Sequence, residues 1–369
     1  MNNIIAIRSL ASPHHATHVE PTVFSVTWDL GKRCNYDCSY CSPTVHDWTS
    51  PHMPLDTAKE FLAKVDAWAI DNQRTVKWSF TGGEPYLNPE IIDILSAVRD
   101  TKSCDDMIAV ITNGSMPLEL YQESMASVTN LTISLHFDRT PKEIEKTLEK
   151  IIVLNTANPD RFITVQVMMY PGKFDYISTV VKQLEANNVK HVYRRIRPFT
   201  DDLYSDLFGD QDKRTVLKTK VNADTHHQQR GELKSYLHNN LLRIYDSGEY
   251  YTEQELIWLK TNIPEVRWQN IGVWDKDKNY SEINSDELVS NNLHQFKDWT
   301  CYVGVDSAYI DSTGDIYRGS CTNGGSIGSV GDFVGFCTVP TVCGYKLCIS
   351  NQDLIIRKSA PGNEKLITN

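Results

Sequence analysis

The fold class is best inferred from residues 75–112, which read TVKWSFTGGEPYLNPEIIDILSAVRDTKSCDDMIAVIT. Thr75–Thr81 is strand-like and stops at two glycines, and Met107–Thr112 is a short apolar strand that ends at Asn113-Gly114. Between them, Pro89–Asp100 has the pattern of a helix and begins with proline, which is favoured in the first helical turn. The order strand, helix, strand predicts a parallel sheet that is covered by helices.

The same alternation continues on both sides of this stretch, from Thr22 to about Arg197. The further expected elements are the strands Val23–Asp29, Leu131–His136, Phe162–Met169 and Val189–Ile196 and the helices Thr57–Asp71 and Pro141–Asn155. About six strands are too few for a closed eight-stranded barrel, so we predict an α/β fold, a partial (β/α)6 TIM-like barrel. Its chemistry should gather at the carboxyl ends of the strands.

Composition and local patterns divide the whole chain into five expected parts. They are an N-terminal lead at residues 1–20, the barrel at 21–200, a helical connector at 201–295, a small C-terminal β-hairpin domain at 296–350 and a tail at 351–369. In the connector, Thr252 with Glu255 three residues on forms a capping-box pattern that predicts a helix start. The C-terminal hairpin should turn at residues 311–314, Asp-Ser-Thr-Gly.

Composition also narrows the function classes. The 369 residues are 40% hydrophobic and 23% charged, which argues against a disordered, collagen-like or coiled-coil protein. A net charge of -10 argues against bulk binding of nucleic acid, which needs clustered Lys and Arg. There is no run of eighteen apolar residues, and the N-terminus lacks the basic lead-in of a signal peptide, so we expect a cytoplasmic protein without a membrane partner.

The nine cysteines are grouped as metal ligands often are, with three early and five late in the chain. The early group, Cys34-Asn-Tyr-Asp-Cys38-Ser-Tyr-Cys41, has the spacing C-x3-C-x2-C. Three thiolates on one loop can hold three corners of an iron–sulfur cubane and leave the fourth iron without a protein ligand. The alternatives are a zinc loop, although structural zinc usually takes four protein ligands, or three unrelated cysteines.

The cysteine loop, the Gly82-Gly83-Glu84-Pro85 element and the Thr112-Asn113-Gly114 strand end together resemble the radical SAM superfamily over roughly residues 20–200. The resemblance implies a [4Fe–4S] cluster on three cysteines, with the amino and carboxylate groups of S-adenosylmethionine on the open iron. Those cysteines are Cys34, Cys38 and Cys41. The resemblance also implies a set of residues near S-adenosylmethionine, namely Tyr40, Gly82, Gly83, Glu84, Pro85, Asn113, Ser134 and Gln166.

Within that set, the resemblance implies that Gly82, Gly83 and Glu84 contact the methionine amino group and that Tyr40 packs near adenine. Three basic residues at the last barrel strand could reach a carboxylate or could be solvated or ion-paired instead. They are Arg194, Arg195 and Arg197. His136 follows a strand end and is a candidate general acid or base, with a hydrogen-bonded barrel histidine as the alternative.

The late cysteines and the hairpin Ile310–Cys321 resemble the auxiliary-cluster domains of the SPASM and twitch subfamilies. By that resemblance, four cysteines bind one auxiliary [4Fe–4S] cluster: Cys301, Cys321, Cys343 and Cys348. The full SPASM pattern has seven cysteines, so the five present favour a single, twitch-type cluster and leave open whether Cys337 replaces one ligand. A zinc knuckle is the alternative. An auxiliary cluster with four protein ligands would serve in electron transfer, whereas a cluster with three would let substrate bind its open iron.

These patterns lead to three functional hypotheses. The first is a radical SAM oxidoreductase or isomerase that acts on a peptide, a protein side chain or a small metabolite, with flavodoxin or ferredoxin as electron donor. The second keeps the chemistry but takes a nucleotide, a nucleotide sugar or a modified nucleic-acid base. A basic stripe of Arg194, Arg195, Arg197, Lys213 and Arg214 would support binding of a nucleic acid. The third is a non-catalytic iron–sulfur electron carrier or binding protein.

Overall fold

The computed structural model describes residues 4–9, 23–38, 40–41, 47–196, 251–262, 270–284, 288, 291, 293–345, 348 and 351–368. Three residues of the expected basic stripe, Arg197, Lys213 and Arg214, lie outside these ranges, as does the connector up to residue 250. Within the described ranges, no helix has the length and apolar character needed to cross a membrane.

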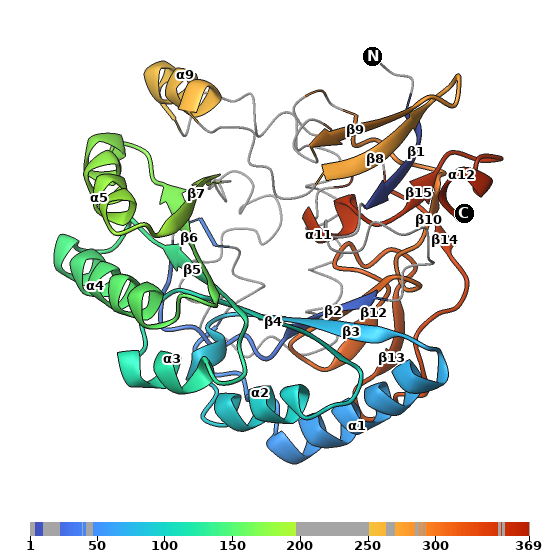
Figure 1. Ribbon diagram of the computed structural model, residues 1–369, viewed down its shortest axis with the longest axis horizontal. Coiled ribbons are helices and arrows are strands. Elements are labelled where there is room, and N and C mark those ends of the chain that lie inside the picture. The colour runs from blue at the N-terminus through green and yellow to red at the C-terminus, as the bar shows by residue number, and fades with distance from the viewer. Residues whose placement is uncertain are drawn as a thin grey trace, which may run out of the picture.

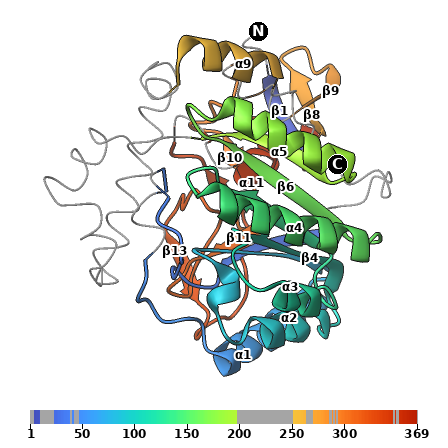
Figure 2. The ribbon, with the colours of Figure 1, turned by 90° about the vertical axis from the view of Figure 1, so that its left-hand side faces the viewer.

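Six parallel strands form one side of a nine-stranded sheet, and helices connect them (Figure 1). The strands are β2 (Val23–Asp29), β3 (Thr75–Thr81), β4 (Cys104–Thr112), β5 (Asn130–Leu135), β6 (Phe162–Met169) and β7 (Lys190–Arg195). The connecting helices are α1 (Leu55–Asp71), α2 (Ile91–Arg99), α3 (Leu118–Ser124), α4 (Pro141–Ala157) and α5 (Phe174–Ala186). The sheet curves with all five helices on its outer side (Figures 1 and 2). The predicted α/β partial barrel is therefore confirmed.

The strands alternate between an apolar face and a polar face. On β3, the outward side chains of Val76, Trp78 and Phe80 are fully buried in the core that the helices complete. The opposite face pairs polar residues across β2 and β3, with Thr27 beside Ser79 and Asp29 beside Thr81. Since every second residue of a strand points to the same side, the concave wall of the barrel is lined by small hydroxyl-bearing side chains. This wall suits a polar ligand.

The predicted C-terminal hairpin is present but is joined to the barrel. It consists of β11 (Ser307–Ile310) and β12 (Asp315–Tyr317), followed by β13 (Ser326–Ser329). β11 pairs in parallel with β2, so the hairpin extends the barrel sheet beyond its first strand. The sequence predicts a separate small domain for this hairpin, because a pairing between such distant segments leaves no local pattern.

A second sheet brings together both ends of the chain (Figure 1). Its order is β14 (Thr341–Val342), β10 (Thr300–Cys301), β15 (Lys358–Ser359), β1 (Ile4–Ser9), β8 (Asn270–Asp275) and β9 (Tyr280–Asn284). The expected N-terminal lead thus supplies β1, and the expected tail supplies α11 (Asn351–Leu354), β15 and α12 (Lys365–Thr368). The described part of the expected helical connector contains α9 (Glu253–Asn262) but also the strand pair β8 and β9.

A largely buried ion pair connects the second sheet to the first. Asp306 immediately precedes β11, and Arg357 immediately precedes β15. The Arg357 guanidinium donates two hydrogen bonds of 2.7 Å to the Asp306 carboxylate and lies 4.3 Å from the centre of the Tyr302 ring. This bidentate geometry holds the cysteine-bearing C-terminal segment in a defined position against the barrel.

Candidate active site

The double-glycine turn after β3 lies directly on the segment that leads into the first cysteine. The Gly83 N–H donates to the Gly31 carbonyl at 3.0 Å, and the Glu84 N–H donates to the Arg33 carbonyl at 2.8 Å. A Cβ on Gly82 would lie 2.4 Å from the Gly31 carbonyl oxygen, and a Cβ on Gly83 would lie 2.3 Å from the Lys32 carbonyl oxygen. No side chain fits at either position, so both glycines are required for this close backbone approach.

Glu84 connects the ends of two neighbouring strands. It is 2% exposed, and its carboxylate accepts hydrogen bonds from the Tyr86 N–H at 3.1 Å, the Thr112 hydroxyl at 2.7 Å and the Asn113 N–H at 2.7 Å. Burial raises the pKa of Glu84 to about 7, against the opposing effect of these hydrogen bonds. Three internal partners leave the carboxylate little free accepting capacity. A contact of its side chain with the methionine amino group stays a prediction.

Asn113 extends this network to the cysteine loop. Its side-chain N–H donates to the Asn35 amide oxygen at 3.0 Å and lies 3.8 Å from the Cys34 sulfur. Its amide oxygen accepts the Ser115 N–H at 2.9 Å. The end of β4 therefore orients the first cysteine, a role for Asn113 that the sequence pattern does not predict.

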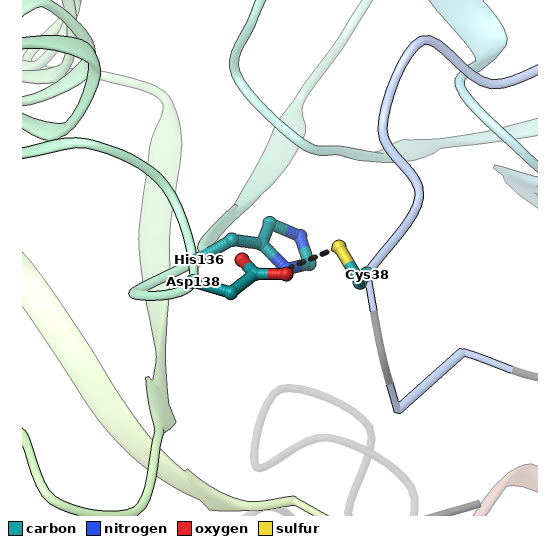
Figure 3. Close-up of side chains that lie close together, drawn as sticks. All are labelled: Cys38, His136 and Asp138. Atoms are coloured by element: carbon teal, nitrogen blue, oxygen red, sulfur yellow. Dashed lines mark hydrogen bonds between the residues drawn. The ribbon is translucent and has the colours of Figure 1, made fainter.

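The middle cysteine faces the residues that follow β5 (Figure 3). The Cys38 sulfur lies 3.4 Å from His136 Nδ1, and the Tyr40 hydroxyl lies 2.5 Å from the same nitrogen. One ligand atom each from Cys38, His136 and Asp138 forms a group within 4.8 Å. His136 is thus hydrogen-bonded within the barrel, as the structural alternative expects, and it also lies beside a proposed cluster ligand.

The cysteine loop has the donor chemistry for an iron–sulfur cluster. Burial raises the pKa of Cys34 to about 11 and raises that of Cys38 further, so thiolates at these positions need a metal to stabilise them. Within the described residues, no three cysteine sulfurs lie within 4.8 Å of one another. Sulfurs around one tetrahedral zinc are only about 3.8 Å apart, given Zn–S bonds of about 2.3 Å. Three sulfurs around a single zinc ion are therefore not in place on this loop.

The late cysteines surround one cavity of about 280 Å³, including the part that opens to solvent. The lining residues are Cys301, Val303, Cys321, Asn323, Cys343, Tyr345, Cys348, Asp353 and Lys358. All four predicted ligands are buried, and burial raises the pKa of the Cys301 thiol to about 11. Cys337, the fifth late cysteine, is half-buried and does not line the cavity. The four sulfurs also fall outside the spacing of a zinc site.

Residues 28–173 match the family model described as the radical SAM superfamily. This segment is a radical SAM domain. Its resident cofactors are a [4Fe–4S] cluster and S-adenosylmethionine, for which the soft sulfur donors on the cysteine loop are suited.

Relatives of this chain include proteins named for nucleotide chemistry. A GTP 3',8-cyclase of Desulforamulus reducens is 26% identical over 179 residues, which cover 47% of each chain. An S-adenosylmethionine-dependent nucleotide dehydratase of Psychrobacter lutiphocae is 24% identical over 200 residues, 48% of this chain and 66% of that protein. The chain spans about half the length of the curated cyclases it matches.

A solved structure, anSMEcpe with bound AdoMet, matches with a TM-score of 0.46 at 14% identity over 84% of this chain and 75% of that chain.

The radical SAM domain places two of the predicted cofactor residues side by side. Ser134 and Gln166 are register partners on β5 and β6, and both are half-buried on the concave wall. Tyr40 stacks on His136, with ring centres 6.0 Å apart and an interplanar angle of 16°. Their contacts with S-adenosylmethionine remain predictions, as does the loop-shaping role of Pro85, which is buried at the start of a short 3-10 turn.

Two of the three basic residues, Arg194 and Arg195, lie on β7 and have partners within the protein. On β7, Arg194 lies beside Met168 of β6, and the Arg195 guanidinium lies 5.8 Å from the centre of the Tyr251 ring. Two further residues at the cysteine cavity, Asp353 and Lys358, have no sequence pattern that singles them out. Only the folding of the chain brings them to the four sulfurs.

Proposed function

We propose that this radical SAM enzyme binds its catalytic cluster through the cysteine loop and acts on a nucleotide. The observation that carries the proposal is the clamping of this loop by the turn after β3. When bound, the two cofactors together supply one-electron cleavage of the C5′–S bond, which gives methionine and a 5′-deoxyadenosyl radical able to remove hydrogen from an unactivated carbon. The ligands we assign are Cys34, Cys38 and Cys41.

The protein's contribution to this chemistry is orientation. Backbone hydrogen bonds from Gly83 and Glu84 hold the segment before Cys34, while the Asn113 amide orients that cysteine from the neighbouring strand. Because these contacts are made by buried and backbone groups, they restrict movement of the loop relative to the barrel wall. Such positioning fixes the first cysteine relative to the concave wall, where Ser134 and Gln166 lie.

Nucleotide substrates are supported by the two named relatives, a GTP cyclase and a nucleotide dehydratase. These similarities favour the second hypothesis of the sequence analysis over the first, in which a peptide or small metabolite is modified. The concave wall is consistent with this choice, since Ser79 and Thr81 offer hydroxyl groups to a ribose or phosphate. A reductant is also needed, and flavodoxin or ferredoxin is our candidate.

We further propose that the late cysteines bind one auxiliary [4Fe–4S] cluster with four protein thiolates. The support is the shared cavity, the burial of all four sulfurs and a spacing wider than zinc requires. With every iron ligated by Cys301, Cys321, Cys343 or Cys348, this cluster carries electrons and does not bind substrate. Cys337 takes no part.

The test is anaerobic turnover of the reconstituted enzyme with S-adenosylmethionine, dithionite and a panel of ribonucleoside triphosphates, with a peptide panel in parallel. We expect one nucleotide to stimulate formation of 5′-deoxyadenosine and, when deuterated on the sugar, to transfer label into it. Cys38→Ala should abolish the signal, and Cys104→Ala is the matched control, because Cys104 lies at the opposite end of β4 from the site. Stimulation by peptides alone would refute the substrate class.

The same assay addresses the non-catalytic hypothesis. A carrier or binding protein with a fully loaded cluster should form no 5′-deoxyadenosine in the presence of S-adenosylmethionine and reductant. Formation of this product in the wild type and its loss in Cys38→Ala would establish radical chemistry independently of the substrate.

A further inference from the structure

A buried lysine lines the cavity of the late cysteines. Lys358 is 1% exposed and belongs to β15, the strand that pairs with β10 and so lies next to Cys301. Its ammonium donates hydrogen bonds to the carbonyl oxygens of Asp353, of Leu354 at 3.3 Å and of Ile356 at 2.9 Å. All three N–H donors are thus used on neutral acceptors at the end of α11.

The neighbouring carboxylate is engaged elsewhere. Asp353 accepts hydrogen bonds from the Cys321 N–H at 2.7 Å and from the N–H and hydroxyl of Ser320, at 3.2 and 3.0 Å. In the described part of the chain, no carboxylate lies within ion-pair distance of the Lys358 ammonium. The centre of the Phe296 ring lies 5.3 Å from Lys358 Nζ and shields it.

A buried ammonium with neutral acceptors needs a nearby negative charge to offset its loss of hydration. The four cysteine sulfurs line the same cavity and would supply such a charge as metal-bound thiolates, in addition to the Asp353 carboxylate that is hydrogen-bonded to Ser320 and Cys321. Four thiolates around a [4Fe–4S] core leave a net negative charge, and reduction of the core adds one more. The low dielectric of the interior strengthens the attraction between this charge and Lys358.

We infer that Lys358 is the built-in countercharge of the auxiliary cluster, a positioning residue that raises the cluster's reduction potential. The inference rests on the proposed auxiliary cluster. A fixed positive charge stabilises the reduced cluster more than the oxidised one, so it makes the cluster a better electron acceptor. The Asp353 carboxylate, which accepts a hydrogen bond from the Cys321 N–H, lowers the reduction potential of the cluster.

The test uses a background variant, Cys34→Ala/Cys38→Ala/Cys41→Ala, in which only the auxiliary cluster remains. In this background, Lys358→Met removes the charge but keeps the aliphatic stem, and Lys358→Arg keeps the charge. An electron paramagnetic resonance redox titration should show that Lys358→Met lowers the ratio of reduced to oxidised cluster about tenfold at a given potential, or about 59 mV for one electron. Lys358→Arg should stay close to the background.

A second readout separates the charge from a purely structural role. Thermal unfolding of each variant is compared with and without the cluster. A countercharge predicts that Lys358→Met destabilises the loaded protein more than the cluster-free protein, whose cavity holds neutral thiols. Equal destabilisation of both forms, or a loaded Lys358→Met protein with an unchanged potential, would overturn the inference.

Failure of the underlying proposal gives a different result. A background variant that binds no iron would refute the auxiliary cluster itself, and the countercharge with it. If iron is bound at the expected content but the reduction potential is the same with and without the Lys358→Met substitution, only the countercharge would be refuted.

Discussion

Substitution of Gly83 by alanine tests how the cysteine loop is held. Gly83 has no positive φ that would favour glycine, so the backbone itself tolerates alanine and the cost is steric. The new Cβ would meet three backbone atoms, at 2.3 Å from the Lys32 oxygen and at 2.4 and 2.7 Å from the Arg33 oxygen and carbon. Contacts under 3.0 Å are essentially never seen for Cβ, so the backbones must separate by the difference between 2.3 and 3.0 Å, about 0.7 Å.

The energetic cost follows from the contacts that this separation breaks. Two backbone hydrogen bonds, from Gly83 to Gly31 and from Glu84 to Arg33, are each worth about 1 kcal/mol. Overpacking adds about 1–3 kcal/mol. We therefore expect Gly83→Ala to lower the free energy of unfolding by about 3–5 kcal/mol. A displacement approaching 1 Å at the cysteine loop should also slow cleavage of S-adenosylmethionine by about 10²-fold.

The assays are urea denaturation of the cluster-free protein and, after anaerobic reconstitution, iron content and the rate of 5′-deoxyadenosine formation. Gly31→Ala is the matched control, because it lies in the same contact but its Cβ would come no closer than 3.5 Å to His52. That variant should unfold within about 1 kcal/mol of the wild type. If Gly83→Ala were as stable and as active as Gly31→Ala, the proposed clamp on the loop would be wrong.

Three further predictions concern the late cysteines, the ion pair between the sheets and the buried glutamate. Cys321→Ala should lose about half of the iron yet still cleave S-adenosylmethionine, whereas Cys337→Ala should keep all of it; equal losses in iron assays would place Cys337 among the ligands. Asp306→Asn leaves Arg357 buried without its carboxylate and should cost about 3–5 kcal/mol in urea titrations; a loss under about 1 kcal/mol would contradict the structural role of the pair. Burial raises the pKa of Glu84 from 4.5 to about 7, so the folded protein keeps this proton when the unfolded chain has lost it. The cluster-free protein should lose about 3 kcal/mol of stability through Glu84 as the pH rises from 4.5 to 7, and Glu84→Gln should remove that part of the slope; parallel pH profiles would disprove it.

Much of the barrel was predictable because its signals are local. Period-2 and helical patterns identify the strands and most of the helices, and they predict β3 with its observed bounds, Thr75–Thr81. Two helices of the barrel, α3 (Leu118–Ser124) and α5 (Phe174–Ala186), were missed, and the seven residues of α3 carry little periodicity. The strands β8 and β9 were also missed, because the polar composition around them favoured helices.

The proposed first metal site could likewise be predicted from the sequence, since the three early cysteines share one short loop. For the late cysteines, the sequence pattern selected four of the five but could not exclude Cys337, which lies between Cys321 and Cys343 in the chain. Only the folded cavity separates them, because metal ligands are chosen by position in space and not by order along the backbone.

The amino-acid order alone therefore determined the parallel barrel, the early cysteine loop and the superfamily resemblance, all of which depend on residues close together in the chain. The tertiary structure decided which distant segments meet. It placed β11 beside β2, β1 beside β15, and the ammonium of Lys358 beside four sulfurs. It also showed that the N–H groups of Gly83 and Glu84 bind the backbone before Cys34, and that the Glu84 carboxylate binds the Asn113 N–H after β4. Such contacts leave no periodic signal, because burial and charge compensation depend on the whole folded chain.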